Sequence, residues 1–211
     1  MYSSVVFDDL RSRCPNVACF YGDYKDQNNQ TLVNILGTFL HQFLATAQKL
    51  IPIPDEITKR LYNIQCEGGK LGIKENLALL KLRLHQLKCA YICIDAIDEL
   101  DPDVRWKLLK ELKELSTKNT RLFLTGRNHI ESEVRKQFQI LEGNQVTISA
   151  TQQDIEDFAS QKIKEDRDQD PETMDDILAK DILDTVVGES RGMYVLEFAV
   201  YYCQNGHILI C

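Results

Sequence analysis

Apolar residues along the first 150 positions follow two different periods. Between Leu32 and Leu44 they recur every three or four positions, which is the period of one face of an α-helix. The same period predicts further helices over residues 3–13, 55–64, 76–87, 101–115 and 130–138. Short continuous apolar runs instead predict buried strands over residues 17–21, 89–94, 121–125 and 145–148. Because strands alternate with helices, we expect an α/β fold with a parallel sheet in a three-layer sandwich.

The pattern changes after about residue 150, where no further strand is predicted. Helical spacing predicts a helix over residues 151–166, with Phe158 among its inward residues and Thr151 as its N-cap. Two more helices are predicted over residues 172–187 and from Met193 to about Cys203. We therefore expect two domains, an α/β domain over residues 1–150 and a small helical subdomain with a tail over residues 151–211.

Three acidic residues follow the predicted strand over residues 89–94. Asp95 comes directly after its last apolar residue, and Asp98 and Glu99 come one turn later. Ligands of open α/β sheets bind at the carboxyl ends of the strands, and carboxylate oxygens suit Mg²⁺, a hard ion that keeps several waters. In a P-loop enzyme, an acid in the place of Asp95 holds the metal through its water shell. Asp98 or Glu99 would then polarise the attacking water.

Acidic residues after a strand have two other interpretations, and the spacing of the acids bears on one of them. Acids after a strand often begin the next helix as caps, and that interpretation stays open. A phosphatase of the haloacid type needs Asp-x-Asp after the strand, whereas Asp95 and Asp98 form Asp-x-x-Asp. The spacing therefore argues against such a phosphatase.

The next predicted strand also ends in polar residues. The segment Arg121-Leu-Phe-Leu-Thr-Gly-Arg127 places Thr125 and then Arg127 at a carboxyl end that should lie beside the first. An arginine in this position can reach the terminal phosphate of a nucleotide. An arginine after a strand is more often a surface ion-pair partner, but its spacing from the acidic strand favours a phosphate contact. Thr125 and Arg127 are therefore candidate cofactor-binding residues.

Together these segments resemble a known family. Four apolar residues, then Asp95-Ala-Ile-Asp98-Glu99, a helix, and LFLTGR ending in Arg127 resemble the Walker B and sensor 1 elements of NACHT domains. The strings Phe20-Tyr-Gly-Asp23 and Ser190-Arg-Gly-Met-Tyr194 are similar to those of fungal NACHT proteins with nephrocystin-like N-terminal domains. The resemblance covers about residues 3–200.

The resemblance implies a P-loop nucleoside-triphosphatase of the STAND class, followed by a small helical subdomain. It further implies a signalling ATPase or GTPase that uses Mg²⁺ and ATP or GTP as cofactors. In this family the nucleotide state switches oligomerisation, typically in non-self recognition or programmed cell death. The implied partners are therefore a nucleoside triphosphate and other copies of the protein or related NACHT proteins.

The chain departs from the family at the phosphate-binding loop. A P-loop needs GxxxxGK[ST], whereas the only Gly-Lys pair, Gly69–Lys70, is followed by Leu71 and has Ile64 where the first glycine should stand. The resemblance places the loop and its strand upstream of Met1, so we expect a parallel sheet that is incomplete at its N-terminus.

Three expectations about activity follow from that missing loop. The chain alone should bind a triphosphate weakly and hydrolyse it negligibly, so whether it acts as an enzyme stays open. The alternative is a non-catalytic module that binds related NACHT proteins. A further alternative is a fragment that folds poorly, because a missing strand leaves sheet edges open.

The helical part also has Gly192-Met-Tyr194 where related ATPases have Gly-x-Pro, so no adenine contact is assigned.

Charge and composition narrow the choice of partners and compartment. The formal net charge of −7 and the pI near 5.2 argue against nucleic acid as a partner, since phosphate binding needs a basic face. The lysines between Lys107 and Lys113 alternate with Glu and Leu, which predicts a solvated helix face. No apolar run approaches the roughly 18 residues of a membrane span. The seven irregularly spaced cysteines indicate free thiols, and we expect a cytoplasmic protein.

Overall fold

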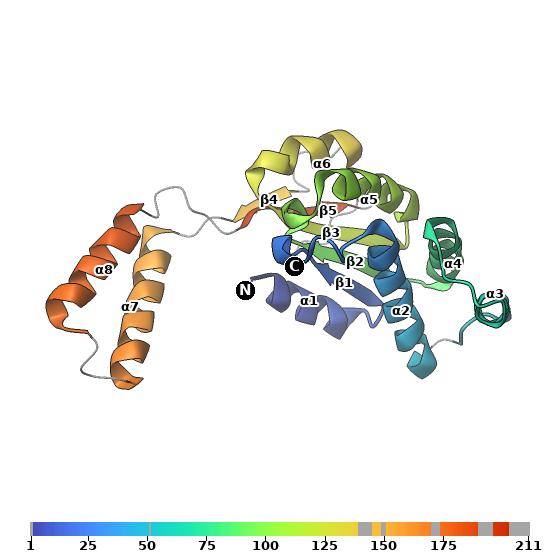
Figure 1. Ribbon diagram of the computed structural model, residues 1–211, viewed down its shortest axis with the longest axis horizontal. Coiled ribbons are helices and arrows are strands. Elements are labelled where there is room, and N and C mark those ends of the chain that lie inside the picture. The colour runs from blue at the N-terminus through green and yellow to red at the C-terminus, as the bar shows by residue number, and fades with distance from the viewer. Residues whose placement is uncertain are drawn as a thin grey trace. The chain divides into compact units, whose positions relative to one another are not determined.

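The computed structural model describes residues 2–50, 52–138, 145–148, 151–169, 174–189 and 196–202 (Figure 1). Two compact units make up the chain. The first, the α/β unit, runs from Met1 to Val146 and includes the segment from Phe198, and the second, the helical unit, is Thr147–Glu197.

The α/β unit contains helices and strands that alternate along the chain. In order, they are α1 (Tyr2–Arg13), β1 (Val17–Tyr21), α2 (Leu32–Leu50), α3 (Asp55–Cys66), α4 (Ile73–Gln86), β2 (Ala90–Asp95), α5 (Pro102–Leu115), β3 (Thr120–Gly126), α6 (Glu131–Phe138), β4 (Gln145–Ile148) and β5 (Leu196–Tyr202). Each of the first three strands is followed by a short 3₁₀ turn: η1 (Tyr24–Asp26), η2 (Ile97–Glu99) and η3 (Asn128–Ile130). The predicted strands and the helices before residue 140 are confirmed, with ends that shift by a few residues.

The sheet has five strands in the order β1-β2-β3-β5-β4. The first three are parallel, with Tyr21 opposite Asp95 and Ile94 opposite Leu124, so that their carboxyl ends lie at one edge of the sheet. An α/β fold with a small parallel sheet is therefore confirmed. Its assignment to the P-loop class stays a prediction.

The strand β5 corrects two expectations. The segment from Met193 to about Cys203 was expected to be a helix within a domain over residues 151–211, but Leu196–Tyr202 is a strand antiparallel to β3. The outer edge of β3 exposes backbone N–H and C=O groups that a further strand satisfies. The sequence LEFAVYY is rich in aromatic and β-branched residues, which suits that role. The chain thus returns from the helical unit to the sheet.

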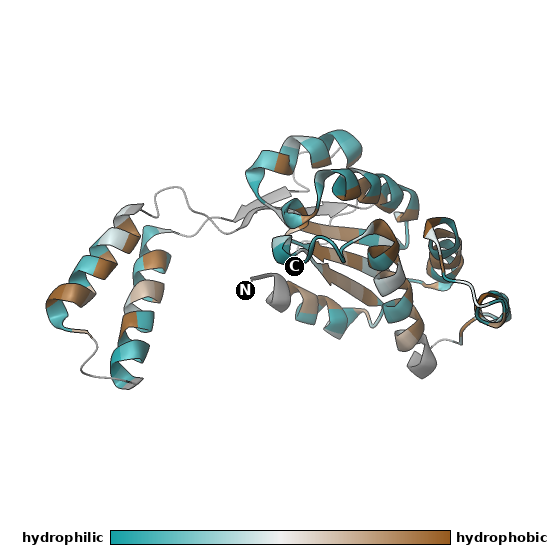
Figure 2. Cartoon of the chain, viewed as in Figure 1, coloured by the Kyte–Doolittle hydropathy of each residue, from teal (hydrophilic) through white to brown (hydrophobic). Residues whose placement is uncertain are grey.

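The α/β unit has a separate apolar cluster on each face of its sheet. On one face, Ile92, Leu122 and Leu124 pack with the inner sides of the helices from α2 to α6. On the other face, Cys19, Cys93 and Phe123 pack with Phe7 and Leu10 of α1. Figure 2 shows this arrangement as hydrophobic strands between helices whose hydrophilic sides face outward. The alternation of side chains along each strand produces the two faces, and the result is three layers, one of which consists of α1 in the described part of the chain.

The outer edge of β1 is capped by a side chain. The Gln42 amide of α2 accepts a hydrogen bond from the Cys19 backbone N–H at 2.9 Å and donates one to the Cys19 carbonyl at 2.7 Å. These are the bonds that a neighbouring strand would make. Both outer strands of the parallel sheet, β1 and β3, therefore have backbone groups engaged beyond that sheet.

The helical unit is a pair of helices, α7 (Gln152–Gln169) and α8 (Asp176–Glu189). Thr151 caps α7, because its hydroxyl accepts from the Asp154 N–H at 3.2 Å while the Asp154 carboxylate accepts from the Thr151 N–H at 2.7 Å. The expectation that Phe158 points inward is wrong, since its side chain is 64% exposed. A partner helix covers only one side of α7, and Phe158 lies at the edge of its apolar stripe.

Cys14, Cys19, Cys66, Cys89 and Cys93 are free thiols, as predicted for them. Within the part of the chain that the structure describes, every helix is too short or too polar to cross a membrane. The cytoplasmic location stays a prediction.

Candidate functional site

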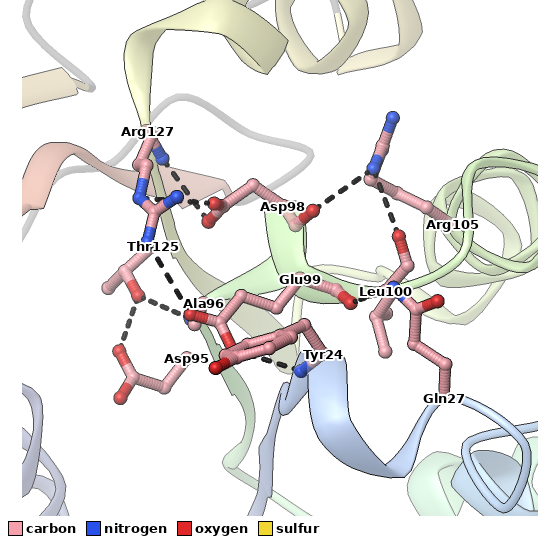
Figure 3. A network of polar contacts seen from close by, with 10 residues as sticks. All are labelled: Tyr24, Gln27, Asp95, Ala96, Asp98, Glu99, Leu100, Arg105, Thr125 and Arg127. Atoms are coloured by element: carbon pink, nitrogen blue, oxygen red, sulfur yellow. Dashed lines mark hydrogen bonds and ion pairs between the residues drawn. The ribbon is translucent and has the colours of Figure 1, made fainter.

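The carboxyl ends of β1, β2 and β3 bring together all five residues that the sequence singled out. Asp95 ends β2, Asp98 and Glu99 lie in η2, Thr125 lies near the end of β3, and Arg127 follows it (Figure 3). The register of the parallel strands explains this, because neighbouring parallel strands end at the same edge. The roles assigned to the five residues stay predictions.

The Asp95 carboxylate is oriented by a buried hydroxyl group. The Thr125 hydroxyl donates a hydrogen bond to Oδ1 of Asp95 at 2.5 Å and accepts one from the Ala96 N–H at 3.0 Å. Thr125 itself is almost fully buried. A hydroxyl has one proton, so the Ala96 N–H directs that proton toward Asp95. Thr125 therefore fixes the direction in which Asp95 presents its carboxylate.

The turn from β2 into η2 depends on an unusual backbone conformation. Ala96 is left-handed, with φ 52° and ψ 49°, and is the only non-glycine residue with positive φ in the described part of the chain. The Gly22 N–H donates to the Asp95 carbonyl at 2.8 Å. A Cβ on Gly22 would lie 2.2 Å from the Ala96 carbonyl oxygen, so this close approach requires glycine. The end of β1 thus holds the turn from one side.

Asp98 anchors the end of β3. Its side chain is only 4% exposed; Oδ1 accepts from the Arg127 backbone N–H at 3.3 Å, and Oδ2 lies 3.6 Å from Nε of Arg127. The neighbouring Gly126 leaves room for this carboxylate, since a Cβ there would lie 3.3 Å from it. In this structure Asp98 is therefore an ion-pair partner of Arg127, held beneath the surface.

Glu99 is more accessible and links the site to the loop after β1. Its Oε2 accepts from the Tyr24 backbone N–H at 3.1 Å, and its Oε1 lies 3.7 Å from Nη2 of Arg127. Its backbone carbonyl accepts from the Gln27 amide at 2.8 Å. Glu99 thus connects η1 and the guanidinium of Arg127, as Figure 3 shows.

Arg105 supports η2 from behind. This mostly buried side chain of α5 donates from Nη1 to the carbonyls of Asp98 at 3.4 Å and Leu100 at 3.2 Å. Its Nε lies 3.1 Å from the Glu133 carboxylate on α6. The guanidinium therefore ties the site loop to two helices of the α/β unit.

Sequence reasoning missed four residues that shape the site. They are Gly22, Tyr24, Gln27 and Arg105. Gly22 stands within the string Phe20–Asp23, which contributes to the family resemblance without indicating a structural role for the glycine. Tyr24 and Gln27 act through single contacts with a residue more than 70 positions away, which no local pattern in the sequence reveals.

The donor groups of the site suit a metal that keeps its own waters. Among the described residues, no group of three or more His, Cys, Asp or Glu side chains is arranged to hold a metal ion. A cation at Asp95 would therefore take most of its ligands from water or from phosphate oxygens. Mg²⁺ binds proteins in this way, through one or two carboxylates. The residues present are compatible with that ion held at Asp95 through its waters, and its binding stays a prediction.

Tyr21 ends β1 next to this group of residues. Its ring lies edge-to-face against Phe7, with centroids 5.5 Å apart. Partial burial, followed by the nearby Cys19 and Asp95, raises the pKa of the phenol above its ordinary value of 10.0. Tyr21 therefore stays neutral beside the carboxylates and adds no charge to the site.

The chain matches a known protein family over more than half of its length. The family model described as "Nephrocystin 3, N-terminal" matches residues 1–127, about three fifths of the chain. No curated protein and no solved structure matches. The matched segment ends at Arg127 and so includes all five candidate residues. The chain belongs to the nephrocystin 3 N-terminal family.

Proposed function

We propose that this chain is part of a NACHT-type signalling ATPase or GTPase, in which the site binds Mg²⁺ and the terminal phosphate of a nucleotide. The observation that carries the proposal is the Asp95 carboxylate, oriented by Thr125 at the carboxyl edge of a parallel sheet with Arg127 beside it. The family match and the resemblance to Walker B and sensor 1 elements support the same assignment.

Each residue has a proposed role that follows from its surroundings. Asp95 holds the cation through water, and the bound cation supplies positive charge against the phosphates. Glu99 is 23% exposed and is better placed than the buried Asp98 to polarise water. Asp98 and Thr125 then act as positioning residues. This ordering refines the sequence-based prediction, which treated Asp98 and Glu99 alike.

Arg127 is proposed to sense the terminal phosphate. Its guanidinium is paired with Asp98 and Glu99 at 3.6 and 3.7 Å, which are long, weak ion pairs. A phosphate group would compete with these carboxylates for the guanidinium. Because Glu99 also holds the Tyr24 backbone, loss of the Arg127 contact would be transmitted to η1. The site therefore links the presence of a phosphate to the loop after β1.

The 211 residues contain no GxxxxGK[ST] motif, so most of the binding energy for a triphosphate is absent. We therefore propose that this chain binds a nucleotide weakly, in a Mg²⁺-dependent way, and hydrolyses it negligibly. The second candidate function, a non-catalytic module that binds related NACHT proteins, is favoured by the same missing motif beside an ordered acidic strand end.

Equilibrium binding of fluorescent ATP and GTP analogues, with and without Mg²⁺, tests the proposal. We expect weak binding that needs Mg²⁺ and is lost in Asp95→Asn, whereas Asp103→Asn on α5 is the matched control and should bind normally. Measurable turnover that Asp95→Ala abolishes would contradict the predicted inactivity. If no nucleotide binds with or without Mg²⁺, the proposed nucleotide site is rejected. Capture of a full-length relative in a pull-down would then support the second candidate function, a non-catalytic module that binds related NACHT proteins.

A further inference from the structure

Four cysteines lie on the face of the sheet that α1 covers. Cys14, Cys19 and Cys93 belong to the apolar cluster on that face, and Cys89 packs against it. They form two pairs of neighbouring thiols, Cys19 with Cys93 and Cys14 with Cys89. The polar surroundings of the two pairs differ, and they give the sulfur atoms different reactivity.

Cys19 and Cys93 are placed so that a bond can join their sulfur atoms. Cys19 of β1 is directly opposite Cys93 of β2 in the parallel register, so both side chains leave the sheet on the same face. Neighbouring strands lie about 4.8 Å apart, and the Cα atoms of a disulfide are usually about 4.4–6.8 Å apart. The Cys93 thiol also donates a hydrogen bond to the sulfur of Cys19. The backbone therefore permits a disulfide here without a change of register.

The sulfur of Cys19 has a positively charged neighbour. Nη2 of Arg11 on α1 lies 3.8 Å from Sγ of Cys19. The hydrogen bond from Cys93 and the positive charge of Arg11 hold the pKa of the Cys19 thiol below its ordinary value of 9.0, against the opposing effects of burial and of Asp8. Burial raises the pKa of the Cys93 thiol, which stays protonated as the donor. Because the thiolate is the reactive form of cysteine, Cys19 is the nucleophile of this pair.

The second pair has the opposite character. The Cys14 thiol donates to the Cys89 carbonyl at 3.2 Å, and burial raises the pKa of Cys14 to about 11. Cys14 is therefore protonated at neutral pH and is a poor nucleophile. Of the two pairs, only the one formed by Cys19 and Cys93 joins a stabilised thiolate to a protonated neighbouring thiol.

A small molecule can approach Cys19 through a pocket beside β1. The pocket has a volume of about 380 Å³, and Arg11, Val17 and Gln42 are among the residues that line it. Arg11 contacts the Cys19 sulfur, and the Gln42 amide is bonded to the Cys19 backbone. Cys19 itself is 6% exposed. A water molecule takes up only about 30 Å³, so the pocket admits a reagent the size of a peroxide and excludes large ones from the thiol.

We propose that Cys19, activated by Arg11, and Cys93 form a dithiol that a small peroxide oxidises to a disulfide. The Cys19 thiolate attacks one peroxide oxygen, the O–O bond breaks, and the leaving hydroxide takes up a proton to become water. Cys19, oxidised by two electrons, is then a sulfenic acid. The Cys93 sulfur attacks the Cys19 sulfur, the S–O bond breaks, and a second water leaves with the Cys93 proton. A small thiol reverses the disulfide by exchange. The proposal does not depend on the nucleotide site.

Mass mapping of the unmodified full chain after treatment with hydrogen peroxide tests the proposal directly. Remaining thiols are alkylated in urea and the chain is digested without reductant. We expect a peptide pair linked through Cys19 and Cys93, lighter by two hydrogens than the separate peptides and lost on treatment with dithiothreitol. If Cys19 and Cys93 both remain alkylatable, or if the linked pair is Cys14 with Cys89, the proposal is overturned.

Variants separate the two steps of the reaction. Cys93→Ser removes the second thiol, so Cys19 should stay a sulfenic acid that dimedone captures. Cys19→Ser should leave Cys93 without an adduct, and an adduct at Cys93 would overturn the order of the steps. Circular dichroism of each variant confirms that it is folded.

A matched pair of arginine variants tests the activation of Cys19. Arg11→Gln should slow formation of the disulfide by at least about twofold, because an exposed charge contributes modestly to the stability of the thiolate. Arg13→Gln is the control, since Arg13 lies on the same helix and pairs with Asp9 at 2.9 Å instead. The control should react at the rate of the unmodified chain. Equal rates in both variants would overturn the role of Arg11.

Discussion

The α/β unit and the helical unit are both built from amphipathic helices, yet they bury their apolar residues to different extents. In α2, Ile35, Leu36 and Phe39 are fully buried. In the described part of the helical unit, the only residues classed as buried are the small Ala159 and Ala179. The α/β unit is therefore held together by packing between layers. The helical unit relies on the apolar stripe that α7 and α8 share, on the Thr151 cap and on ion pairs. The two units therefore differ in how far their helices are buried, although both have the helical pattern of apolar residues.

The largest expected effect comes from the α/β core. Phe39→Ala removes a fully buried ring that lies edge-to-face with Phe20, and we expect the free energy of unfolding to fall by about 3–5 kcal/mol. Phe158→Ala makes the same chemical change at an exposed position of the helical unit and should cost less than about 0.5 kcal/mol. Urea denaturation followed by Trp106 fluorescence, which reports on the α/β unit, measures the first change. Similar costs for both variants would contradict the comparison.

A smaller effect is expected at the candidate site. Gly22→Ala would place a Cβ 2.2 Å from the Ala96 carbonyl oxygen, and the backbone must shift to accommodate it. We expect a loss of about 3 kcal/mol, at the upper end of the usual cost of overpacking. Gly37→Ala in α2 is the matched control, because a Cβ there makes only an ordinary van der Waals contact, 3.9 Å from the side-chain oxygen of Asn76, and alanine favours a helix. Thermal melts should therefore move in opposite directions for the two variants, and a shift in the same direction would contradict this account.

The helical unit should respond to a change that leaves the α/β unit unaffected. Thr151→Ala removes the cap of α7, at an expected cost of about 0.5–2 kcal/mol. The helical signal in circular dichroism should weaken at lower denaturant concentration, while Trp106 fluorescence keeps its midpoint. A shift of both midpoints together would show that the two units unfold as one.

The smallest expected effect is a dependence of that cap on pH. The hydroxyl and the backbone N–H of Thr151 donate to the Asp154 carboxylate and hold its pKa below the ordinary value of 3.8. The contribution of the pair is therefore complete above pH 3.8 and is lost as the pH falls through the lower pKa of the folded state. The stability gap between the unmodified chain and Thr151→Ala should narrow in acid. A gap that stays constant down to about pH 2 would contradict this assignment.

The sequence predicted most of the α/β unit because its signals are local. The run Val17–Tyr21 and the helical spacing after Leu32 each identify an element without knowledge of the rest of the chain. The apolar run of β5 fits both a helical and a strand period, and its pairing with the outer edge of β3, 72 to 80 positions earlier in the chain, selects the strand. Contacts between distant segments are not encoded in a local period.

At the candidate site, too, some features could be predicted from the sequence and others could not. Asp95, Thr125 and Arg127 could be brought together in advance because parallel neighbours end at one edge of a sheet. The difference between Asp98 and Glu99 could not be predicted. It depends on the left-handed turn at Ala96, which buries one carboxylate and leaves the next one accessible.

That turn has a consequence for protein engineering. An alanine held in the left-handed region is strained by about 1 kcal/mol, and glycine adopts the same conformation freely. The hydrogen bond from the backbone of residue 96 to Thr125 needs no side chain. Ala96→Gly is therefore a route to a more stable chain with the Asp95–Thr125 geometry intact, suited to experiments that require long-lived samples.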